Sequence, residues 1–324
     1  MQAYYKGNAV SLGGGASSGW STWNVTDDTA PSAADMSALK GYTSDQLMTN
    51  VYDALMEAWP TYITKSTIGK DATNTYNIYQ YIFCPDYPEQ TIYIQSGVHG
   101  GEYDGWIGLA NLMKLICNHW QEHEWLAYLR WKCRIIVVPI VNVWSVSTNH
   151  TRKNYNNVDL NRDLNSETPQ AETVAMKANF AALMQAYDIS FCIDYHTTTD
   201  PSWGGDAAIG DSPTSINAPV TALVAKAIAK KYAHQRLSSY VTAHELEADE
   251  LYLPFWFNTG NPGTYSGYFR SFGLVSVTLE FADDIYIANR GVELTGRISL
   301  DLITNHVIAL AQHKYVVTEV TSVT

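Results

Sequence analysis

The sequence lacks any apolar run long enough to cross a bilayer, and it is poor in basic residues. A membrane-spanning helix needs about 20 consecutive apolar residues, and no such stretch occurs among the 324 residues. Lysine and arginine together number 20 against 32 aspartates and glutamates, which gives a net charge of −12. Nucleic acids and anionic membranes select clustered Lys and Arg. The composition therefore predicts neither as a partner, and it leaves the oligomeric state open.

Cysteine is scarce, and the amino-terminal residues lack a secretory pattern. The four cysteines, which show no close metal-type spacing, are Cys84, Cys117, Cys133 and Cys192. Two of them stand in apolar, strand-like runs, where cysteine usually acts as a small hydrophobe, so we predict free thiols. Residues 1–15 contain one Lys and no apolar segment of the kind found in signal peptides. As written, the chain is expected to be cytoplasmic or to be exported by another route.

Hydrophobic residues make up 46% of the chain, which predicts a sizeable core. We expect an irregular N-terminal arm or linker over residues 1–33, rich in Gly, Ser, Thr and Asp towards its end, and one catalytic domain over 34–324. Strands are predicted over 62–69, 76–83, 91–96, 134–141, 189–195 and 274–281, and helices over about 43–59, 103–128, 169–187, 219–232 and 292–312. An opening hairpin followed by alternating strands and helices indicates an α/β fold: a mixed parallel and antiparallel sheet with helices on both faces.

One strand-like run ends in a pattern typical of a metal site. The segment Thr91–Ser96 is followed by Gly97, and then His99 and Glu102 stand three residues apart. Glycine lets the backbone turn sharply where the strand ends. The two side chains can therefore converge from a loop, at the carboxyl end of a strand where open α/β sheets place their ligands.

The His-x-x-Glu spacing alone does not identify this site, because it occurs three times. The second copy, His119 and Glu122, lies in an amphipathic helical segment and reads as a solvated surface pair. The third, His244 and Glu247, lies in an acidic run of the kind usually found in solvated loops or helix ends. Only the first copy follows a strand and opens a helix.

A third ligand is predicted at the end of another strand. The apolar run from Ile189 ends at His196. A histidine there is often structural, but this one has the position needed to complete a His/Glu/His set. Imidazole and carboxylate suit Zn²⁺, and three protein ligands leave a fourth position for water. We therefore expect one catalytic zinc ion per chain.

A carboxylate at the end of a further strand is the candidate general base. Glu280 follows a mostly apolar run that begins at Leu274. It could be a solvated strand-end residue, but burial of a lone carboxylate beside a metal-activated water would give it a function. A base must reach that water without binding the metal itself, and Glu280 meets this requirement from its own strand end.

Further short motifs extend the pattern. In chain order, the pieces are His99-x-x-Glu102, Arg152-Lys153, Val158-Asp159-Leu160-Asn161-Arg162, Asp194-Tyr195-His196 and Leu279-Glu280. This ordered set, spread over most of residues 90–285, resembles the zinc carboxypeptidases of the carboxypeptidase A type, also called funnelins.

The resemblance implies a role for each matching residue. His99, Glu102 and His196 would bind zinc, and Glu280 would be the base and later the proton donor. Arg152 would stabilise the oxyanion, as preorganised cations do. Asn161 and Arg162 would hold the terminal carboxylate of the substrate, and Asp159 would fix the tautomer of His99. From the residues alone, both arginines would read as surface cations.

The sequence departs from the family pattern at the pocket. No tyrosine stands at the position of the family's mobile substrate-contacting Tyr, so Tyr252, Tyr265 and Tyr268 remain candidates. Counting back from Glu280 without gaps places Tyr265 at the base of the specificity pocket. The absence of an acidic residue there argues against a preference for C-terminal Lys or Arg.

We expect a zinc-dependent hydrolase, a metallocarboxypeptidase, that cleaves a peptide or amide bond next to a free C-terminal carboxylate, with cell-wall stem peptides among its candidate substrates. One alternative is an N-acyl amino acid amidohydrolase of the desuccinylase or aspartoacylase type, which shares the His-x-x-Glu, Asn-Arg, His and Glu set. The other is a catalytically silent metal-binding recognition module, although a pure binder would need neither Glu280 nor Arg152.

Overall fold

A computed structural model describes most of the chain. The described residues are 2–5, 8–11, 26, 29–198, 207–210, 255–256, 261–282, 297, 299–301 and 303–311. Within these residues no helix has the length and apolar character required to cross a membrane. The helix predicted over 219–232, the pair His244 and Glu247, and Tyr252 lie outside the described residues.

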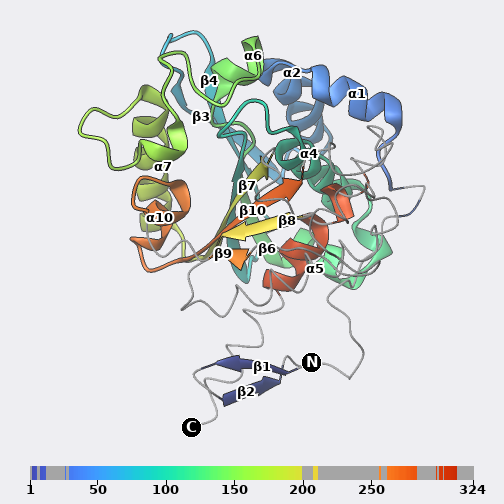
Figure 1. The fold of residues 1–324 in the computed structure, drawn as a ribbon. Helices are drawn as coiled ribbons and strands as arrows, with labels where there is room; N and C mark the ends of the chain where they lie inside the picture. Colours follow the sequence, from blue (N-terminus) through green and yellow to red (C-terminus); the bar gives the residue numbers. More distant parts are fainter. Residues whose placement is uncertain are drawn as a thin grey trace, which may run out of the picture.

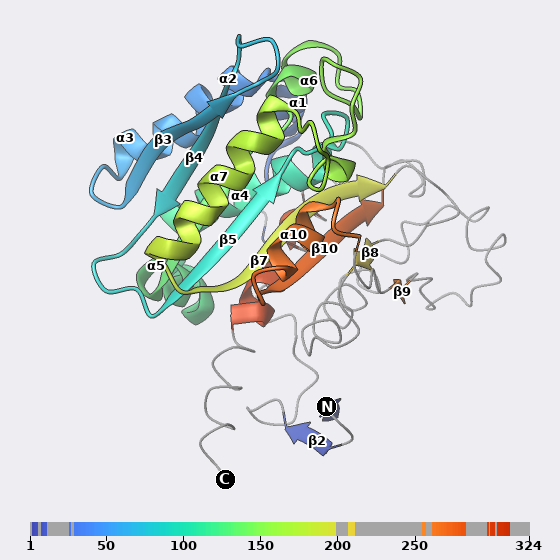
Figure 2. The ribbon, with the colours of Figure 1, turned by 90° about the vertical axis from the view of Figure 1, so that its left-hand side faces the viewer.

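An eight-stranded mixed sheet forms the centre of the fold (Figures 1 and 2). Its strands are β3 (Ile63–Lys70), β4 (Asn77–Phe83), β5 (Gln90–Ser96), β6 (Cys133–Val138), β7 (Ile189–Thr198), β8 (Ala207–Gly210), β9 (Phe255–Trp256) and β10 (Val275–Ala282), in the spatial order β3-β4-β6-β5-β7-β10-β8-β9. Strands β6, β5, β7 and β10 run parallel. Strand β4 pairs antiparallel with β3 and with β6, and β8 pairs antiparallel with β10 and parallel with β9. The predicted mixed α/β sheet is confirmed.

Helices cover both faces of the sheet. They are α1 (Ala33–Gly41), α2 (Ser44–Leu47), the π-helical η1 (Met48–Asp53), α3 (Ala54–Ala58), α4 (Tyr103–Asn118), η2 (Trp120–Glu122), α5 (Glu124–Lys132), α6 (Val143–Thr148), η3 (Leu160–Arg162), α7 (Ala171–Ala186) and α10 (Tyr265–Arg270), with further helical residues at 297, 299–301 and 303–311. Figure 1 shows α7 and α10 on one side of the strands and α4 on the other.

Aromatic rings join the sheet to the helices α7 and α10. The ring of Tyr93 on β5 lies 5.1 Å from that of Phe180 and 5.3 Å from that of Phe269, both in edge-on contacts. On the opposite face, α4 approaches β7 so closely that a Cβ at Gly105 would stand 3.1 Å from the Cβ of Tyr195. Helices therefore pack on both faces of the central strands. This packing holds in place the strand ends at which the candidate site lies.

The predicted elements near the amino terminus are largely confirmed. Thr43 and Gln46 form a capping box at the start of α2, and the helical run continues to Ala58. Strands β3 and β4 form the expected antiparallel hairpin. Inside the arm over 1–33, which was expected to be irregular, β1 (Gln2–Tyr5) and β2 (Asn8–Ser11) pair as an antiparallel hairpin. Tyr and Val, both common in strands, favour this pairing. The division at residue 33 stays a prediction.

The single helix predicted over 103–128 is wrong, because the chain forms α4 and α5 with a break between them. Helix α4 is buried along nearly its whole length and ends at Asn118, whereas the side chains of His119 and Glu122 are exposed. The side chain of His123 then accepts a hydrogen bond from the backbone N–H of Trp125 and caps α5. This cap marks the start of a separate second helix.

Candidate metal centre

The candidate site is built at the carboxyl ends of two neighbouring parallel strands. Strand β5 ends at Ser96, and Gly97 then adopts a positive φ of 63°. Any Cβ at this position would also lie 2.8 Å from the Cδ1 of Ile140. Glycine is therefore required for the turn that leads to His99 and to Glu102, the residue that precedes helix α4. The predicted use of glycine after the strand is confirmed.

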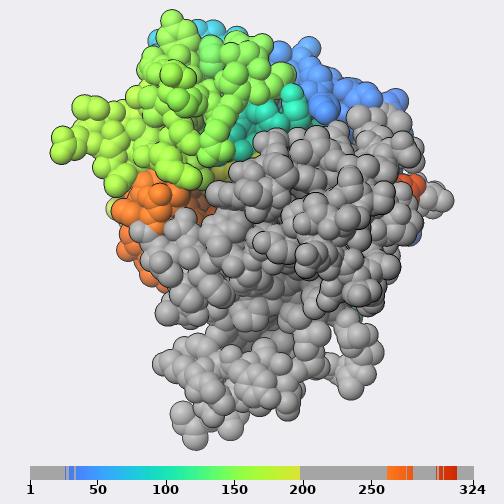
Figure 3. Space-filling view, in the orientation of Figure 1, coloured from blue at the N-terminus to red at the C-terminus, as the bar shows by residue number. Residues whose placement is uncertain are grey.

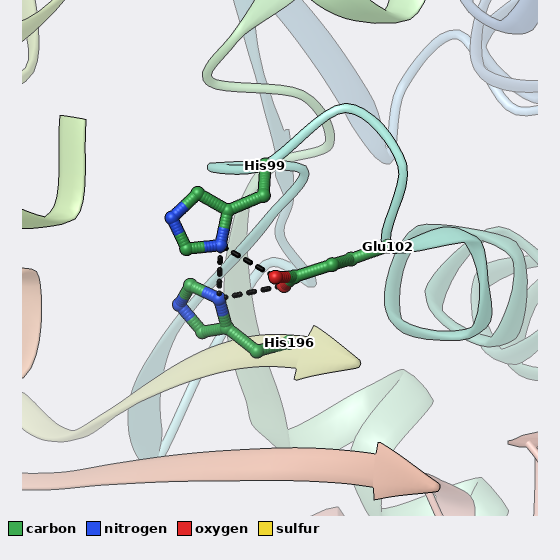
Figure 4. Close-up of side chains that lie close together, drawn as sticks. All are labelled: His99, Glu102 and His196. Atoms are coloured by element: carbon green, nitrogen blue, oxygen red, sulfur yellow. Dashed lines mark hydrogen bonds and ion pairs between the residues drawn. The ribbon is translucent and has the colours of Figure 1, made fainter. Parts of the chain in front are cut away.

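His99, Glu102 and His196 point towards one another (Figure 4). The Nδ1 atom of His99 lies 2.6 Å from Oε1 of Glu102, and the Nδ1 atom of His196 lies 2.8 Å from Oε2. The two Nδ1 atoms are 3.2 Å apart. Within the described part of the chain, these three residues form the one group of His, Cys, Asp and Glu side chains close enough to hold a metal ion, with ligand atoms within 4.8 Å of one another.

Carboxylates hold the far side of each imidazole. The Nε2 atom of His99 lies 3.0 Å from Oδ1 of Asp159, and that of His196 lies 2.9 Å from Oδ2 of Asp194. A carboxylate on Nε2 fixes the tautomer that carries its proton there and leaves the lone pair of Nδ1 for a metal. The donor set, two such nitrogens and one carboxylate, fits Zn²⁺. The predicted contact between Asp159 and His99 is present.

Asp194 is a site residue to which the sequence interpretation assigned no role. It stands two residues before His196 on β7, and residues at i and i+2 of a strand share a face. Asp194 is completely buried, and its Oδ1 accepts a hydrogen bond of 3.1 Å from Nε2 of Gln95 on β5. The Asp-x-His spacing on a predicted strand was the signal that could have identified it.

The electrostatics of the site are dominated by carboxylates around the two imidazoles. Burial would lower the pKa of His196, but the carboxylates of Asp194 and Glu102 hold it well above its usual value. Burial also opposes the charged form of His99, yet Glu102 and Asp159 raise its pKa. Burial would raise the pKa of Glu102, whereas the two imidazoles hold it well below its usual range. The cluster therefore attracts positive charge, either protons or a metal cation.

Arg152 lies beside this cluster and is partly exposed. Its side chain is 52% exposed, its Nε donates a 2.9 Å hydrogen bond to Oδ2 of Asp159, and its Nη1 lies 3.5 Å from Oε1 of Glu102. Asp159 thus contacts His99 through its Oδ1 and Arg152 through its Oδ2. The structure brings the predicted cation to the edge of the site.

Asn161 and Arg162 lie beside the same centre, on the short helix η3. The side chain of Asn161 is buried, with Nδ2 3.4 Å from Nε2 of His196 and Oδ1 accepting a 3.0 Å hydrogen bond from the backbone N–H of Tyr265. Arg162 is exposed, and its Nη1 donates to the backbone carbonyl of Asn161. Figure 3 shows the green surface of the segment that includes η3 against the orange surface of α10. The two residues predicted to bind the substrate carboxylate thus lie side by side near His196.

The candidate tyrosines have different environments. Tyr265 begins α10 and is 1% exposed, with its ring packed 6.2 Å from that of Phe269. Tyr268 is half-buried and its hydroxyl donates to the backbone carbonyl of Lys177. A substrate contact by either tyrosine stays a prediction.

Glu280 occupies β10, next to the strand that carries His196. The Cα register of the two parallel strands pairs Glu280 with His196 and Thr278 with Asp194. The backbone positions of the predicted base and the third predicted ligand are therefore neighbours. The side chain of Glu280 lies outside the described part of the structure.

The surface reading of the second His-x-x-Glu copy also agrees with the structure. His119 and Glu122 form a pair with Nδ1 and Oε1 2.6 Å apart, and their side chains are 38% and 41% exposed. His99 and Glu102, at the same distance, are 2% and 12% exposed. The two pairs differ in burial and in the presence of a third ligand.

Residues 48–248, more than half of the chain, match the family model described as zinc carboxypeptidase. No curated protein sequence matches the chain.

Several solved structures share the fold. A metallo-carboxypeptidase from Burkholderia cenocepacia is 15% identical, with a TM-score of 0.61 over 84% of this chain and 70% of that one. Carboxypeptidase A from Helicoverpa armigera is 15% identical, with a TM-score of 0.57 over 84% of this chain and 74% of that one. Bovine thrombin-activatable fibrinolysis inhibitor, solved with a tick carboxypeptidase inhibitor, is 16% identical, with a TM-score of 0.57 over 90% of this chain and 98% of that one.

Proposed function

Because this chain belongs to the zinc carboxypeptidase family, we propose that its His99, Glu102 and His196 hold the zinc ion of a metallocarboxypeptidase. One observation carries the proposal. Both imidazoles turn Nδ1 towards the oxygens of Glu102, while both Nε2 atoms are held by carboxylates. This arrangement orients three donors towards one point, as a metal site requires.

The reaction is hydrolysis of the peptide bond next to a free C-terminal carboxylate. When bound, zinc would supply a Lewis acid and would lower the pKa of a water molecule enough for it to give up its proton near neutral pH. We assign the acceptance of that proton, and its later transfer to the leaving amine, to Glu280. The register that pairs its Cα with that of His196 supports this assignment. A positioned carboxylate in this role contributes roughly 10²–10⁴-fold to the rate.

Arg152 is the residue proposed to stabilise the charge that develops on the scissile carbonyl oxygen. Its guanidinium is half-exposed, so a substrate can reach it, and its Nε is anchored on Asp159. An anchored cation needs no reorganisation when the negative charge forms, and this is the property that makes oxyanion stabilisation effective.

The carboxylate end of the substrate is assigned to Asn161 and Arg162. Arg162 is exposed beside Asn161, and a guanidinium fork matches a carboxylate with two hydrogen bonds. Tyr265 is proposed at the base of the pocket for the C-terminal side chain, where the absence of an acidic residue disfavours Lys and Arg. Cell-wall stem peptides, which contain D- or diamino acids, are included as candidate substrates because the aromatic and polar composition of the chain is compatible with them.

A hydrolysis screen read by mass spectrometry tests the function. The zinc-loaded protein would be incubated with C-terminally free peptides, the same peptides with amidated ends, N-acyl amino acids and muropeptides. We expect release of the last residue from free peptides and at least tenfold slower cleavage of amidated ones. Equal cleavage of both would contradict the carboxypeptidase assignment, and cleavage of N-acyl amino acids alone would indicate an amidohydrolase.

The role of Glu280 is tested by Glu280→Gln. We expect a loss of activity of at least about 100-fold with one zinc ion still bound, because the amide cannot accept the proton. Glu122→Gln, which changes an exposed glutamate of the surface pair, is the matched control and should retain activity. Near-wild-type turnover of zinc-loaded Glu280→Gln would refute the assignment of the base.

A further inference from the structure

A cavity lies at the end of the sheet opposite the metal centre. Its volume is about 340 Å³, and most of its lining is aromatic or charged. It lies where α5 leads into β6. Strands β5 and β6 both begin at this end of the sheet, where Gln90 pairs with Cys133. In Figure 2, α5 lies beside the start of β5, away from its arrowhead. His99 follows the other end of β5, about 20 Å away at 3.3 Å per residue.

Arg130, at the end of α5, lines this cavity and is only 2% exposed. Its guanidinium carbon lies 3.4 Å from the ring centre of Tyr62, 4.6 Å from that of Trp131 and 5.0 Å from that of Trp59. Its Nε and Nη1 are buried without a hydrogen-bond partner. Among the described residues, no carboxylate lies within ion-pair distance of it, and the neighbouring Lys132 pairs with Glu89 at 2.7 Å.

A buried cation in this condition is costly unless an anion accompanies it. Aromatic faces attract a guanidinium, but they act on its plane and leave the N–H groups at its edge unsatisfied. Unpaired buried charges and donors each lower stability. Arg130 also lines a cavity, so an anion held in that cavity would lie next to its guanidinium group.

The walls of the cavity indicate the rest of the ligand. Tyr87 is 84% exposed and Trp131 is 46% exposed, and both line the opening together with Trp59. Such rings provide flat apolar surfaces for another flat group. A volume of about 340 Å³ lies near the lower end of the range for small-molecule pockets. It can therefore hold a ligand of about one ring with its charged group.

We propose that this cavity is a ligand site, separate from the metal centre, for a small molecule that carries an oxyanion on a flat apolar group. The guanidinium of Arg130 binds the oxyanion, and the aromatic walls contact the flat group. Carboxylates and phosphates share the required chemistry, and the choice of probes below distinguishes them.

The test uses the zinc-loaded protein labelled with 5-fluorotryptophan and followed by ¹⁹F NMR. The resonances of Trp59 and Trp131 are assigned with Trp→Phe variants, so that binding at this cavity is distinguished from binding at the metal centre. The probes are benzoate, phenyl phosphate, benzamide and inorganic phosphate. We expect saturable shifts of both resonances with benzoate or phenyl phosphate, the stronger one identifying the oxyanion, and at least tenfold weaker binding of benzamide and inorganic phosphate.

Variants link the binding to the guanidinium. Arg130→Lys should weaken the better probe at least tenfold, because the planar donor set is lost. Arg134→Lys is the matched control, since Arg134 also stacks on a ring, 4.2 Å from Tyr187, but donates to Thr91 and does not line the cavity. It should bind as the wild type does. If Arg130→Lys does not fold, Trp131→Ala should weaken binding at least threefold, read at Trp59.

Three results would overturn the proposal. Benzoate and phenyl phosphate could leave both resonances unchanged, or benzamide could bind as tightly as benzoate. Alternatively, Asp86, which lines the same cavity, could be the counter-ion of Arg130 in solution. In that case the probes would bind only after Asp86→Asn, whereas we expect them to bind the wild-type protein.

Discussion

The carboxylate of Asp159 joins two parts of the proposed active site, and its replacement gives the most informative prediction. Its Oδ1 lies 3.0 Å from Nε2 of His99 and 2.9 Å from the backbone nitrogen of Asn161, and its Oδ2 lies 2.9 Å from Nε of Arg152. Burial would raise the pKa of Asp159, but its hydrogen bond with His99 and the charges of His99 and Arg152 hold it well below its usual range. It is therefore an anion at neutral pH.

Asp159→Asn keeps the size of the side chain and removes its charge. The amide has one oxygen for the two side-chain donors, so it can orient His99 or anchor Arg152 but not both. Loss of such an outer contact typically weakens metal binding or activity by roughly 10–100-fold, which corresponds to about 1.4–2.7 kcal/mol. We expect zinc affinity, measured by competition with a fluorescent chelator, to fall within this range, and kcat to fall further because Arg152 loses its anchor.

Asp163→Asn is the matched control for this experiment. Asp163 lies on the same loop and is buried, but its carboxylate accepts a hydrogen bond from the backbone N–H of Gln170. It should retain wild-type zinc affinity, because the Asn oxygen can still accept the hydrogen bond from Gln170 and this side chain is not bonded to His99. Wild-type zinc affinity in Asp159→Asn would refute the reasoning. An equal loss in both variants would show that the loop, and not the contact with His99, was responsible.

Three further predictions follow from the same structure. Asp194→Asn should weaken zinc binding about 10–100-fold, measured by chelator competition, because Asp194 holds Nε2 of His196; unchanged affinity would contradict this. Arg162→Gln should raise KM for free-carboxylate peptides at least tenfold more than for amidated peptides in steady-state assays, and equal effects would point to another clamp. Burial lowers the pKa of His306 to about 3. Its folded pKa thus lies below the unfolded value of about 6.5, so its effect is absent above pH 6.5 and destabilisation grows as the pH falls towards 3. Between pH 7 and pH 5 the free energy of unfolding of the wild-type protein should fall by about 2 kcal/mol through this group. In urea unfolding, the fall for His306→Asn over the same pH range should be smaller by about 2 kcal/mol. An equal fall in both proteins would contradict the prediction.

The sheet and the three candidate ligands could be predicted from the sequence because their signals are local. Strand β5 is an apolar run that ends at a glycine, and His99 and Glu102 follow within six residues. Parallel strands bring their carboxyl ends to one edge, so a histidine at the end of β7 was expected close to this pair. The contact of 2.8 Å between Nδ1 of His196 and Oε2 of Glu102 confirms that expectation.

Other features could not be predicted because they depend on contacts between distant segments. The break between α4 and α5 separates a helix that is buried along nearly its whole length from one with three buried residues, and the helical period alone does not reveal it. The surroundings of Arg130 come from residues such as Tyr62, 68 positions earlier, and nothing near Arg130 in the sequence indicates a buried cation. Asp194, in contrast, could have been predicted, because the Asp-x-His spacing on a predicted strand places it on the same face as His196.

Metal analysis of histidine variants tests the central claim most directly. Elemental analysis after exhaustive dialysis should find one zinc ion per chain in the wild-type protein and in His119→Ala, which changes the exposed His-x-x-Glu pair. His196→Ala should retain less than about a tenth of an equivalent, because one of three protein ligands is lost. Full zinc occupancy in His196→Ala, or loss of zinc in His119→Ala, would contradict the account.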